Sequence, residues 1–296
     1  MEFGKLLTAM VTPFDEQLRV DWNCTGALID YLIEQQASDG LVIAGTTGES
    51  PTLTDEEKLE LFSFAVKRAN GRAKIIAGTG SNDTEHSIHL TKEAEKLGVD
   101  GIMLVAPYYS RTSQAGLVAH FNAIAAATKL PVMIYNIPSR TGINVEAGTM
   151  LKLAETPNIV AVKESSGDLD QMSAIIAKAP EGFRLYSGDD SLTLPVLSIG
   201  GHGIVSVASH IVGKRMKAMI DAYASGRPAE AAKLHLELLP VFKGLFFCPH
   251  RVPNPVPVKY ALKAAGMDVG GVRLPLVNVT PEEAAFLDNL VAGLGE

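Results

Sequence analysis

Two kinds of hydrophobic pattern alternate along this chain of 296 residues. One is a short run of apolar and small residues, which is typical of a buried strand. The other is a longer stretch in which apolar residues return every three or four positions, as they do on one face of a helix. The runs that predict strands are residues 5–11, 40–44, 74–78, 101–105, 131–135, 159–163, 184–187 and 203–207. The stretches that most clearly predict helices between them are residues 55–69, 84–97 and 113–128.

Capping signals mark where several of these helices begin and end. Thr54 precedes three acidic residues at the spacing of a capping box, which predicts a helix start there. Asn82 or Asp83 can cap the next helix. Gly98 follows Leu97 as a stop signal.

Eight strand-then-helix units predict an α/β fold of the (β/α)8, or TIM, barrel type. A doubly wound open sheet is the alternative, but it normally has fewer strands and a glycine-rich turn after the first one. The first strand here ends in Thr12-Pro13-Phe14. After residue 225 the pattern is helical only, over residues 229–247, 257–265 and 281–291. We therefore predict a catalytic barrel in residues 1–224 and a C-terminal helical appendage in residues 225–296.

Composition and charge exclude several classes of protein. The chain is 47% hydrophobic and 20% charged, as is usual for a globular protein. Its net charge is −7 and it has no block of Lys and Arg, which argues against nucleic acid as a partner. Cys24 and Cys248 are far apart, no apolar run could span a bilayer, and no secretion signal is recognisable. We expect a cytoplasmic protein that binds no membrane.

Lys163 ends the apolar run 159–163 and stands directly before a polar turn. In barrels of this type the chemistry is located at the carboxyl ends of the strands. Burial among apolar residues favours the neutral form of a lysine amine, and a neutral amine attacks carbonyl carbon to begin Schiff-base chemistry. The alternative is a lysine whose ammonium reaches past the strand end into water.

Polar residues follow two other predicted strands. Residues 45–50 read Gly-Thr-Thr-Gly-Glu-Ser and can offer hydroxyls and backbone N–H groups to a carboxylate, although such a cluster is often a plain turn. Tyr135 points to the barrel axis if Met133 does, because side chains alternate along a strand. Arg140 offers a bidentate fork for a carboxylate, or else forms a surface salt bridge.

The sequence argues against metal, phosphate and serine-hydrolase chemistry. The seven histidines form no H-E-x-x-H motif, so we expect no metal. Residues 207–210, after the eighth strand, contain no glycine, which disfavours a phosphate-bearing substrate. No G-x-S-x-G nucleophile elbow is present.

Three motifs in chain order resemble those of the dihydrodipicolinate synthase family of pyruvate-dependent class I aldolases and lyases. They are residues 45–49, residues 135–142 and Val162-Lys163-Glu164. The resemblance runs nearly end to end and includes residues 254–259 and 270–276. It implies that pyruvate and L-aspartate 4-semialdehyde are condensed in the diaminopimelate route to lysine, with no cofactor.

The resemblance implies that four side chains carry the chemistry. Lys163 condenses with the ketone of pyruvate. Tyr135 is the general acid and base, and Thr47 links it to Tyr109 in a proton relay. Hydroxyl groups are sufficient for this task because protons move only over hydrogen-bond distances.

The resemblance also implies how the two substrates are bound. The backbone of Thr46 and Thr47 holds the pyruvate carboxylate. Gly188 and Val205 line the pyruvate pocket through their carbonyl groups. Arg140 holds the carboxylate of the semialdehyde.

A homotetramer built as a dimer of dimers follows from the same resemblance, with Tyr109 entering the neighbour's site. Lysine-sensitive members bind lysine at the dimer interface, and the corresponding positions that match here are Ser50, Asn82 and Tyr108. His86 occupies the place of a glutamate that would pair with the ammonium of the ligand, and Lys58 adds a like charge. We therefore expect weak inhibition by lysine, unless Asp55 supplies the missing carboxylate.

Two other functions are alternatives. Another aldolase of the same superfamily would cleave sialic acid or a keto-deoxy sugar acid, but Arg140 and the pair Tyr108-Tyr109 argue against it. A barrel that only binds a keto acid as a sensor would not need Lys163 and Tyr135 together.

Overall fold

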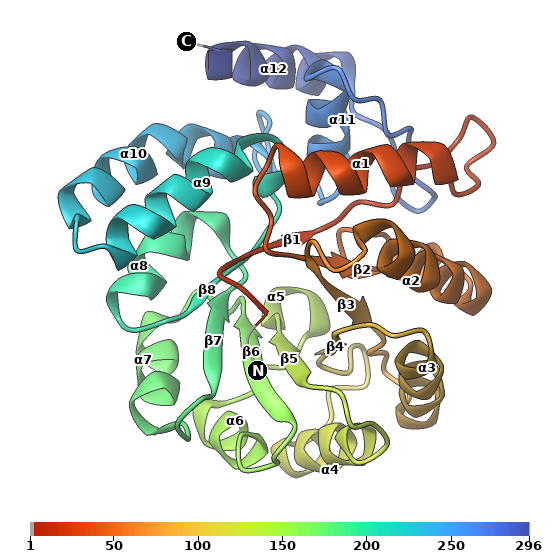
Figure 1. Ribbon diagram of the computed structural model, residues 1–296, viewed down its shortest axis with the longest axis vertical. Coiled ribbons are helices and arrows are strands. Elements are labelled where there is room, and N and C mark those ends of the chain that lie inside the picture. The colour runs from red at the N-terminus through yellow and green to blue at the C-terminus, as the bar shows by residue number, and fades with distance from the viewer. Residues whose placement is uncertain (1–2, 296) are drawn as a thin grey trace.

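Eight parallel strands close into a barrel in chain order, which confirms the predicted fold (Figure 1). The computed structural model describes residues 3–295. β8 pairs with β1 to complete the barrel. The strands are β1 (Leu6–Ala9), β2 (Gly40–Ile43), β3 (Lys74–Gly78), β4 (Gly101–Val105), β5 (Val132–Asn136), β6 (Ile159–Glu164), β7 (Arg184–Ser187) and β8 (Gly203–Ser206).

Helices surround this barrel and cover its outer face (Figure 1). They are α1 (Trp22–Glu34), α2 (Asp55–Ala69), α3 (Thr84–Lys96), α4 (Gln114–Ala125), α6 (Ala147–Leu153), α7 (Leu169–Lys178), α8 (Thr193–Ser198) and α9 (Ser209–Ala224), while the short α5 (Pro138–Thr141) follows the carboxyl end of β5. Short 3-10 turns form at η1 (Ser50–Thr52), η2 (Asp190–Leu192) and η3 (Gly293–Gly295). No helix among residues 3–295 has both the length and the apolar character that a membrane span requires.

The predicted helix signals are confirmed at α2 and α3. Thr54 and Glu57 form the reciprocal capping box at the start of α2. Asp83, rather than Asn82, caps α3, because its carboxylate accepts from the backbone N–H groups of Glu85 and His86. Gly98 adopts a φ of +82° directly after that helix, a conformation that glycine reaches without steric cost.

Two hydrophobic layers hold the barrel together. The larger lies between the strands and the helices, and the smaller fills the barrel interior. The interior layer consists of Phe3, Leu7, Ala9, Val42, Ile76, Met103, Met133, Tyr135, Ala161, Tyr186 and Val205. Since side chains alternate along each strand, neighbouring residues go to different layers.

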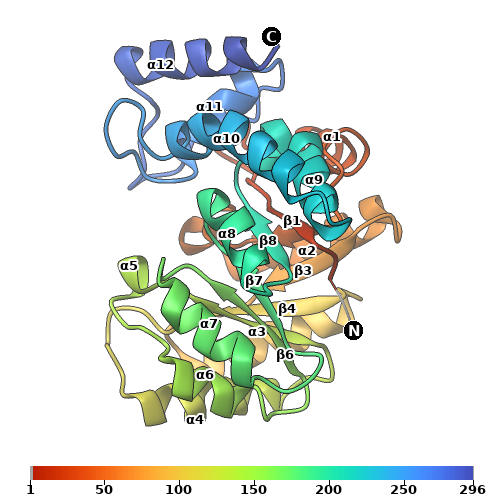
Figure 2. The same ribbon diagram turned by 90° about the vertical axis from the view of Figure 1, so that its left-hand side faces the viewer.

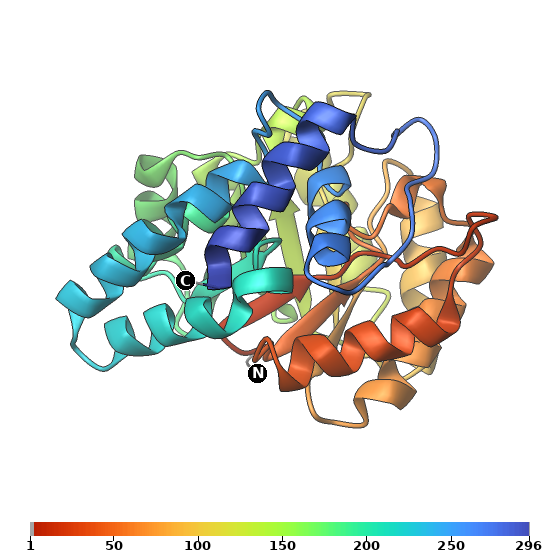
Figure 3. The ribbon, with the colours of Figure 1, turned by 90° about the horizontal axis from the view of Figure 1, so that it is seen from above.

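The C-terminal helices extend the molecule beyond the barrel, as the helical pattern after residue 225 predicts. They are α10 (Pro228–Gly244), α11 (Val256–Ala264) and α12 (Pro281–Ala292). α10 packs against α9, and α11 lies beside α12 (Figures 2 and 3). In Figure 2 the short helix α5, which follows the carboxyl end of β5, lies on the opposite side of the barrel from the N-terminus.

Candidate active site

Lys163 and Tyr135 lie side by side on β6 and β5, where strand pairing places them in register. Both residues are buried, at 5% and 4% exposure. The Nζ atom of Lys163 lies 4.0 Å from the centre of the Tyr135 ring. Tyr135 packs in the barrel interior with Met133, which confirms its predicted orientation. The pair therefore lies together near the carboxyl ends of two neighbouring strands.

Glu164 follows Lys163 in the sequence but faces away from it. Its carboxylate accepts hydrogen bonds from Asn136 Nδ2 at 3.0 Å, from the Ser166 backbone at 2.8 Å and from Gln171 Nε2 at 3.1 Å. Burial raises the pKa of Glu164, although these hydrogen bonds oppose the rise. The adjacent acid thus supports the strand end from outside and provides no counter-charge to Lys163. Sequence reasoning missed this network, although strand alternation was a usable signal.

The loop at residues 45–50 is fixed by Glu49, whose backbone is left-handed with a φ of 58°. Its carboxylate forms an ion pair with Lys259 at 2.7 Å and accepts from the backbone N–H of Arg273 at 2.9 Å. Both members of the ion pair are nearly inaccessible to solvent. The loop that was predicted to hold the pyruvate carboxylate is therefore tied to α11 and to the segment after it.

Asn254 was not singled out from the sequence, yet it contacts two predicted site residues. Its Nδ2 donates to Thr47 Oγ1 at 2.9 Å, and Thr47 is 2% exposed. Its backbone carbonyl accepts from Arg140 Nη2 at 3.5 Å. Residues about 200 positions apart in sequence thus meet beside the site, and the C-terminal segment completes it.

The remaining predicted substrate-binding residues surround the same strand ends. Arg140 is exposed in α5 and, with Thr46, lines a cavity of about 530 Å³ that also borders Tyr135. Gly188 directly follows β7, and its backbone N–H donates to the Glu164 carbonyl at 2.8 Å. Val205 lies in β8, buried in the barrel interior.

Asp190 is another buried acid that sequence reasoning left without a role. Its carboxylate accepts from the Ser206 hydroxyl and from the backbone N–H groups of Val207 and Ala208. Burial raises its pKa to about 6, against the effect of these donors. Asp190 thereby joins the loop after β7, which carries Gly188, to the loop after β8, the strand that contains Val205.

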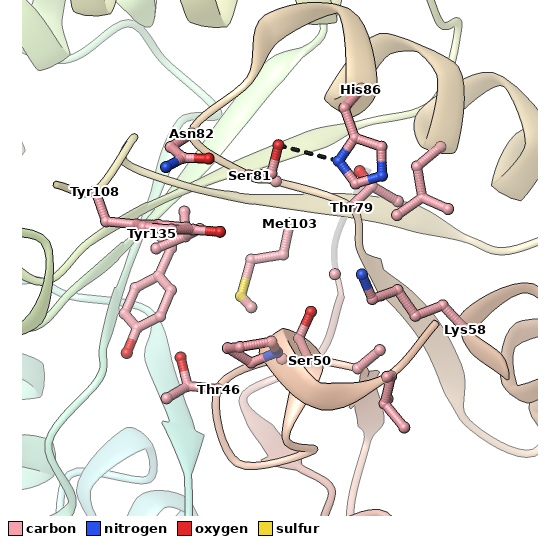
Figure 4. Close-up of a pocket in the computed structure, with 18 of the residues that line it drawn as sticks. Thr46, Ser50, Lys58, Thr79, Ser81, Asn82, His86, Met103, Tyr108 and Tyr135 are labelled. Carbon is pink, nitrogen blue, oxygen red and sulfur yellow. Dashed lines mark hydrogen bonds between the residues drawn. The ribbon is translucent and has the colours of Figure 1, made fainter. Parts of the chain in front are cut away.

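The cavity extends from Tyr135 and Thr46 to a charged cluster at its other end (Figure 4). His86 Nε2 lies 2.7 Å from Asp55 Oδ2, and Lys58 Nζ lies 3.4 Å from Asp55 Oδ1. Burial alone would raise the pKa of Asp55, but the hydrogen bond and charge of His86, together with Lys58, lower it. The carboxylate of Asp55 therefore already interacts with two basic side chains, His86 and Lys58.

The other residues of the predicted effector site line this cavity as well. Ser50, Asn82 and Tyr108 border it, with Asn82 exposed and Tyr108 37% exposed. Tyr109 is 91% exposed with a φ of 75°, and its side chain projects away from the fold of its own chain. Among residues 3–295, no cluster of three or more His, Cys, Asp or Glu side chains could hold a metal ion.

The sequence is similar to named relatives along nearly its whole length. A sequence profile of the dihydrodipicolinate synthetase family matches residues 2–293. The 4-hydroxy-tetrahydrodipicolinate synthase of Bacillus subtilis (strain 168) is 55% identical over 295 residues, covering 99% of this chain and 100% of that protein. The protein of that name from Moorella thermoacetica is 57% identical over 283 residues, covering 96% and 95% of the two chains.

Solved structures show the same agreement. A dihydrodipicolinate synthase from Bacillus anthracis is 48% identical with a TM-score of 0.95, covering 99% of this chain and 98% of that one. The enzyme from Cyanidioschyzon merolae, solved with lysine bound, is 46% identical with a TM-score of 0.95, covering 99% of both chains. A structure 36% identical, with a TM-score of 0.95 and coverage of 99% and 97%, is described as a monomeric dihydrodipicolinate synthase variant.

Proposed function

The chain belongs to the dihydrodipicolinate synthetase family, and from that membership we propose how its residues join pyruvate to L-aspartate 4-semialdehyde. The activity is that of a 4-hydroxy-tetrahydrodipicolinate synthase, a lyase of the class I aldolase type in the diaminopimelate route to lysine. The observation that carries the proposed mechanism is the buried Lys163 beside Tyr135, with no carboxylate paired to it among the described residues.

The first half of the reaction forms a Schiff base on Lys163. The neutral amine attacks C2 of pyruvate, the C=O bond opens, and the oxygen takes a proton to give a carbinolamine. A second proton converts that hydroxyl into water, and the nitrogen lone pair forms the C=N bond as the water leaves. Loss of a methyl proton from the iminium then gives an enamine.

The second half forms the carbon–carbon bond and releases the enzyme. The enamine carbon attacks the aldehyde carbon of the semialdehyde, whose oxygen takes a proton. The amino group of the bound semialdehyde next attacks C2, closes the ring and displaces Lys163 as the free amine. Every proton moves through groups within hydrogen-bond reach of the bound intermediate.

Tyr135 is the proposed general acid and base, with Thr47 and the partner subunit's copy of Tyr109 completing a relay. Asn254 Nδ2 donates to Thr47 Oγ1, which uses one acceptor position of that hydroxyl and leaves its O–H free to donate to a phenol. The 91% exposure of Tyr109 supports its use outside its own chain.

Four backbone groups and one guanidinium are proposed to hold the substrates. The pyruvate carboxylate binds the N–H groups of Thr46 and Thr47, in a loop that the Glu49–Lys259 pair holds in place. The carbonyls of Gly188 and Val205 face the rest of pyruvate. The exposed Arg140 at the cavity rim is placed to pair with the semialdehyde carboxylate as it enters.

We propose a homotetramer formed from two dimers as the working assembly, located in the cytoplasm. The exposed Tyr109 supports the dimer, because a large aromatic side chain so open to water is typical of an interface. Both cysteines are free thiols, which supports a reducing compartment.

The cavity end that holds Asp55, Lys58 and His86 is the proposed effector site, with weak affinity for lysine. Asp55 cannot serve as the missing carboxylate without giving up His86 and Lys58. The ammonium of a bound lysine would therefore compete with His86 and Lys58 for the Asp55 carboxylate.

The function is tested by supplying the purified protein with pyruvate and L-aspartate 4-semialdehyde and following the consumption of pyruvate. We expect turnover that requires both substrates. Cleavage of sialic acid or of keto-deoxy sugar acids, with no turnover of the semialdehyde, would contradict the proposed function.

A further inference from the structure

The hydroxyl of Ser165 is buried and has no hydrogen-bond partner among residues 3–295. A buried hydroxyl without a partner destabilises the folded state, so such groups are uncommon away from functional sites. The neighbouring Ser166 differs, because its Oγ accepts from the backbone N–H of Asp168 at 3.2 Å. The Ser166 hydroxyl therefore has a hydrogen-bond partner in the folded protein, whereas the Ser165 hydroxyl has none among residues 3–295.

Strand alternation places Ser165 on the same side of the chain as Lys163. Glu164, between them, turns outward to Asn136 and Gln171. The backbone fixes Ser165 there, since its N–H donates to the Asn136 carbonyl at 2.9 Å. The unpaired hydroxyl is therefore held on the face of the turn that carries the nucleophile.

The space above Gly188 brings the two side chains together. A Cβ atom added to Gly188 would lie 1.9 Å from Ser165 Oγ and 3.0 Å from Lys163 Cε. The Ser165 hydroxyl thus occupies the room that a side chain at position 188 would need, and the Lys163 side chain borders the same place. The reacting carbon of pyruvate bonds to Nζ, the atom that follows Cε at the end of this lysine chain.

On the basis of the function proposed above, we propose that Ser165 is a further catalytic residue. Its hydroxyl donates a hydrogen bond to the oxygen that pyruvate loses as it joins Lys163. The C2–N bond forms and the C=O bond opens to a carbinolamine hydroxyl, which then takes a proton delivered through Tyr135 and leaves as water. Ser165 stabilises the negative charge on that oxygen during addition and is itself neither protonated nor consumed.

The test follows pyruvate alone, in D2O, by the loss of its methyl proton signal in NMR spectra. Exchange requires the iminium and the enamine but no aldehyde, so it reports the first half of the reaction only. We expect Ser165→Ala to exchange about tenfold more slowly than the wild type, the effect of one lost hydrogen bond to a developing charge. Ser166→Ala is the matched control and should stay within about twofold of the wild type.

Thermal unfolding separates a catalytic role from a structural one. Removing an unpaired hydroxyl should leave the melting temperature of Ser165→Ala unchanged or raise it, because no hydrogen bond within the protein is lost. A clear fall in the melting temperature would mean that the hydroxyl has a structural partner, and would overturn the proposal.

Three further outcomes are decisive. Wild-type exchange by Ser165→Ala, whether or not its KM for the semialdehyde rises, would also overturn the proposal, because the hydroxyl would then play no part in joining pyruvate. Exchange by the wild type but not by Lys163→Ala shows that the proposed function stands independently of Ser165. Absence of exchange in the wild type itself would overturn the proposed function and this inference together.

Discussion

Two buried lysines, Lys163 and Lys259, have similar surroundings but differ in whether an acid is paired with them. They are 5% and 3% exposed, and their Nζ atoms lie 4.0 Å and 4.2 Å from the ring centres of Tyr135 and Phe14. Lys259 has the Glu49 carboxylate at 2.7 Å, whereas no acid among residues 3–295 forms an ion pair with Lys163. A nearby carboxylate favours the charged amine, which is not a nucleophile. Burial therefore does not distinguish the two lysines. They differ in the carboxylate that is paired with Lys259, and the proposed function makes Lys163, which has no such partner among residues 3–295, the reactive amine.

The pKa of Lys259 illustrates the balance of these effects. Burial lowers it to about 8, and the charge and hydrogen bond of Glu49 oppose the fall. The amine thus stays mainly protonated at neutral pH and fixes the loop that precedes η1. In the proposed function Lys163 forms the covalent intermediate, whereas Lys259 holds the loop of residues 45–50 in place.

The largest expected effect comes from Lys163→Ala. Turnover of pyruvate and the semialdehyde should fall by at least about a thousandfold, because no other group can form the covalent intermediate. Thermal stability should be unchanged or higher, since a buried amine without a counter-charge is removed. Substantial residual activity would show that another amine forms the Schiff base.

Lys259→Met should act mainly on stability. Removing one partner of a buried ion pair leaves Glu49 uncompensated and typically costs about 3–5 kcal/mol of the free energy of unfolding. Urea denaturation of the wild type and the variant measures this cost. The double variant Glu49→Gln, Lys259→Met should recover part of it, whereas a single variant as stable as the wild type would refute the contrast between the two lysines.

Mixing two inactive variants tests whether the site around Lys163 is shared between chains. A hybrid dimer of Tyr109→Phe and Lys163→Ala subunits contains one complete site. Random reassembly should restore about a quarter of wild-type activity, since about half of the dimers are hybrids. Full activity in a monomer, shown by light scattering, would contradict a shared site.

The smallest expected effect concerns a third lysine, Lys58, at the far end of the cavity. Because Asp55 is already paired, L-lysine should inhibit the wild type only weakly, at saturating pyruvate. A site that lacks one charge-assisted hydrogen bond binds about tenfold to a hundredfold less tightly. Lys58→Met should remove one of the two basic partners of Asp55 and strengthen inhibition, while Lys67→Met, an exposed lysine on the same helix, should not. Strong inhibition of the wild type at sub-millimolar lysine would show that Asp55 compensates after all.

Most of the barrel could be predicted because its pattern is local. β3, β4, β7 and α2 begin and end where the hydrophobic pattern predicts, and Tyr135 faces the axis as alternation requires. β1 is shorter than the apolar run 5–11, because the run continues into buried residues that no longer pair as a strand. Apolar burial alone cannot mark the end of a ladder of hydrogen bonds.

Contacts across the C-terminal segment could not be predicted, since they depend on how distant parts of the chain meet. Glu49 and Lys259 are separated by most of the sequence, and neither position reveals its partner. The contact of Asn254 with Thr47 is of the same kind. Ser165 was within reach of prediction, because its place two residues after Lys163 puts it on the same face of the chain.

The assignment of the reactive amine to Lys163 rests on its place beside Tyr135 and on its burial without an ion-pair partner among residues 3–295. Its most direct test is reduction with borohydride in the presence of pyruvate, followed by mass spectrometry of the peptides. We expect one reduced pyruvyl adduct per chain, located on Lys163, and an unmodified Lys259. An adduct on Lys259, or an adduct elsewhere that persists with full activity in Lys163→Ala, would contradict it.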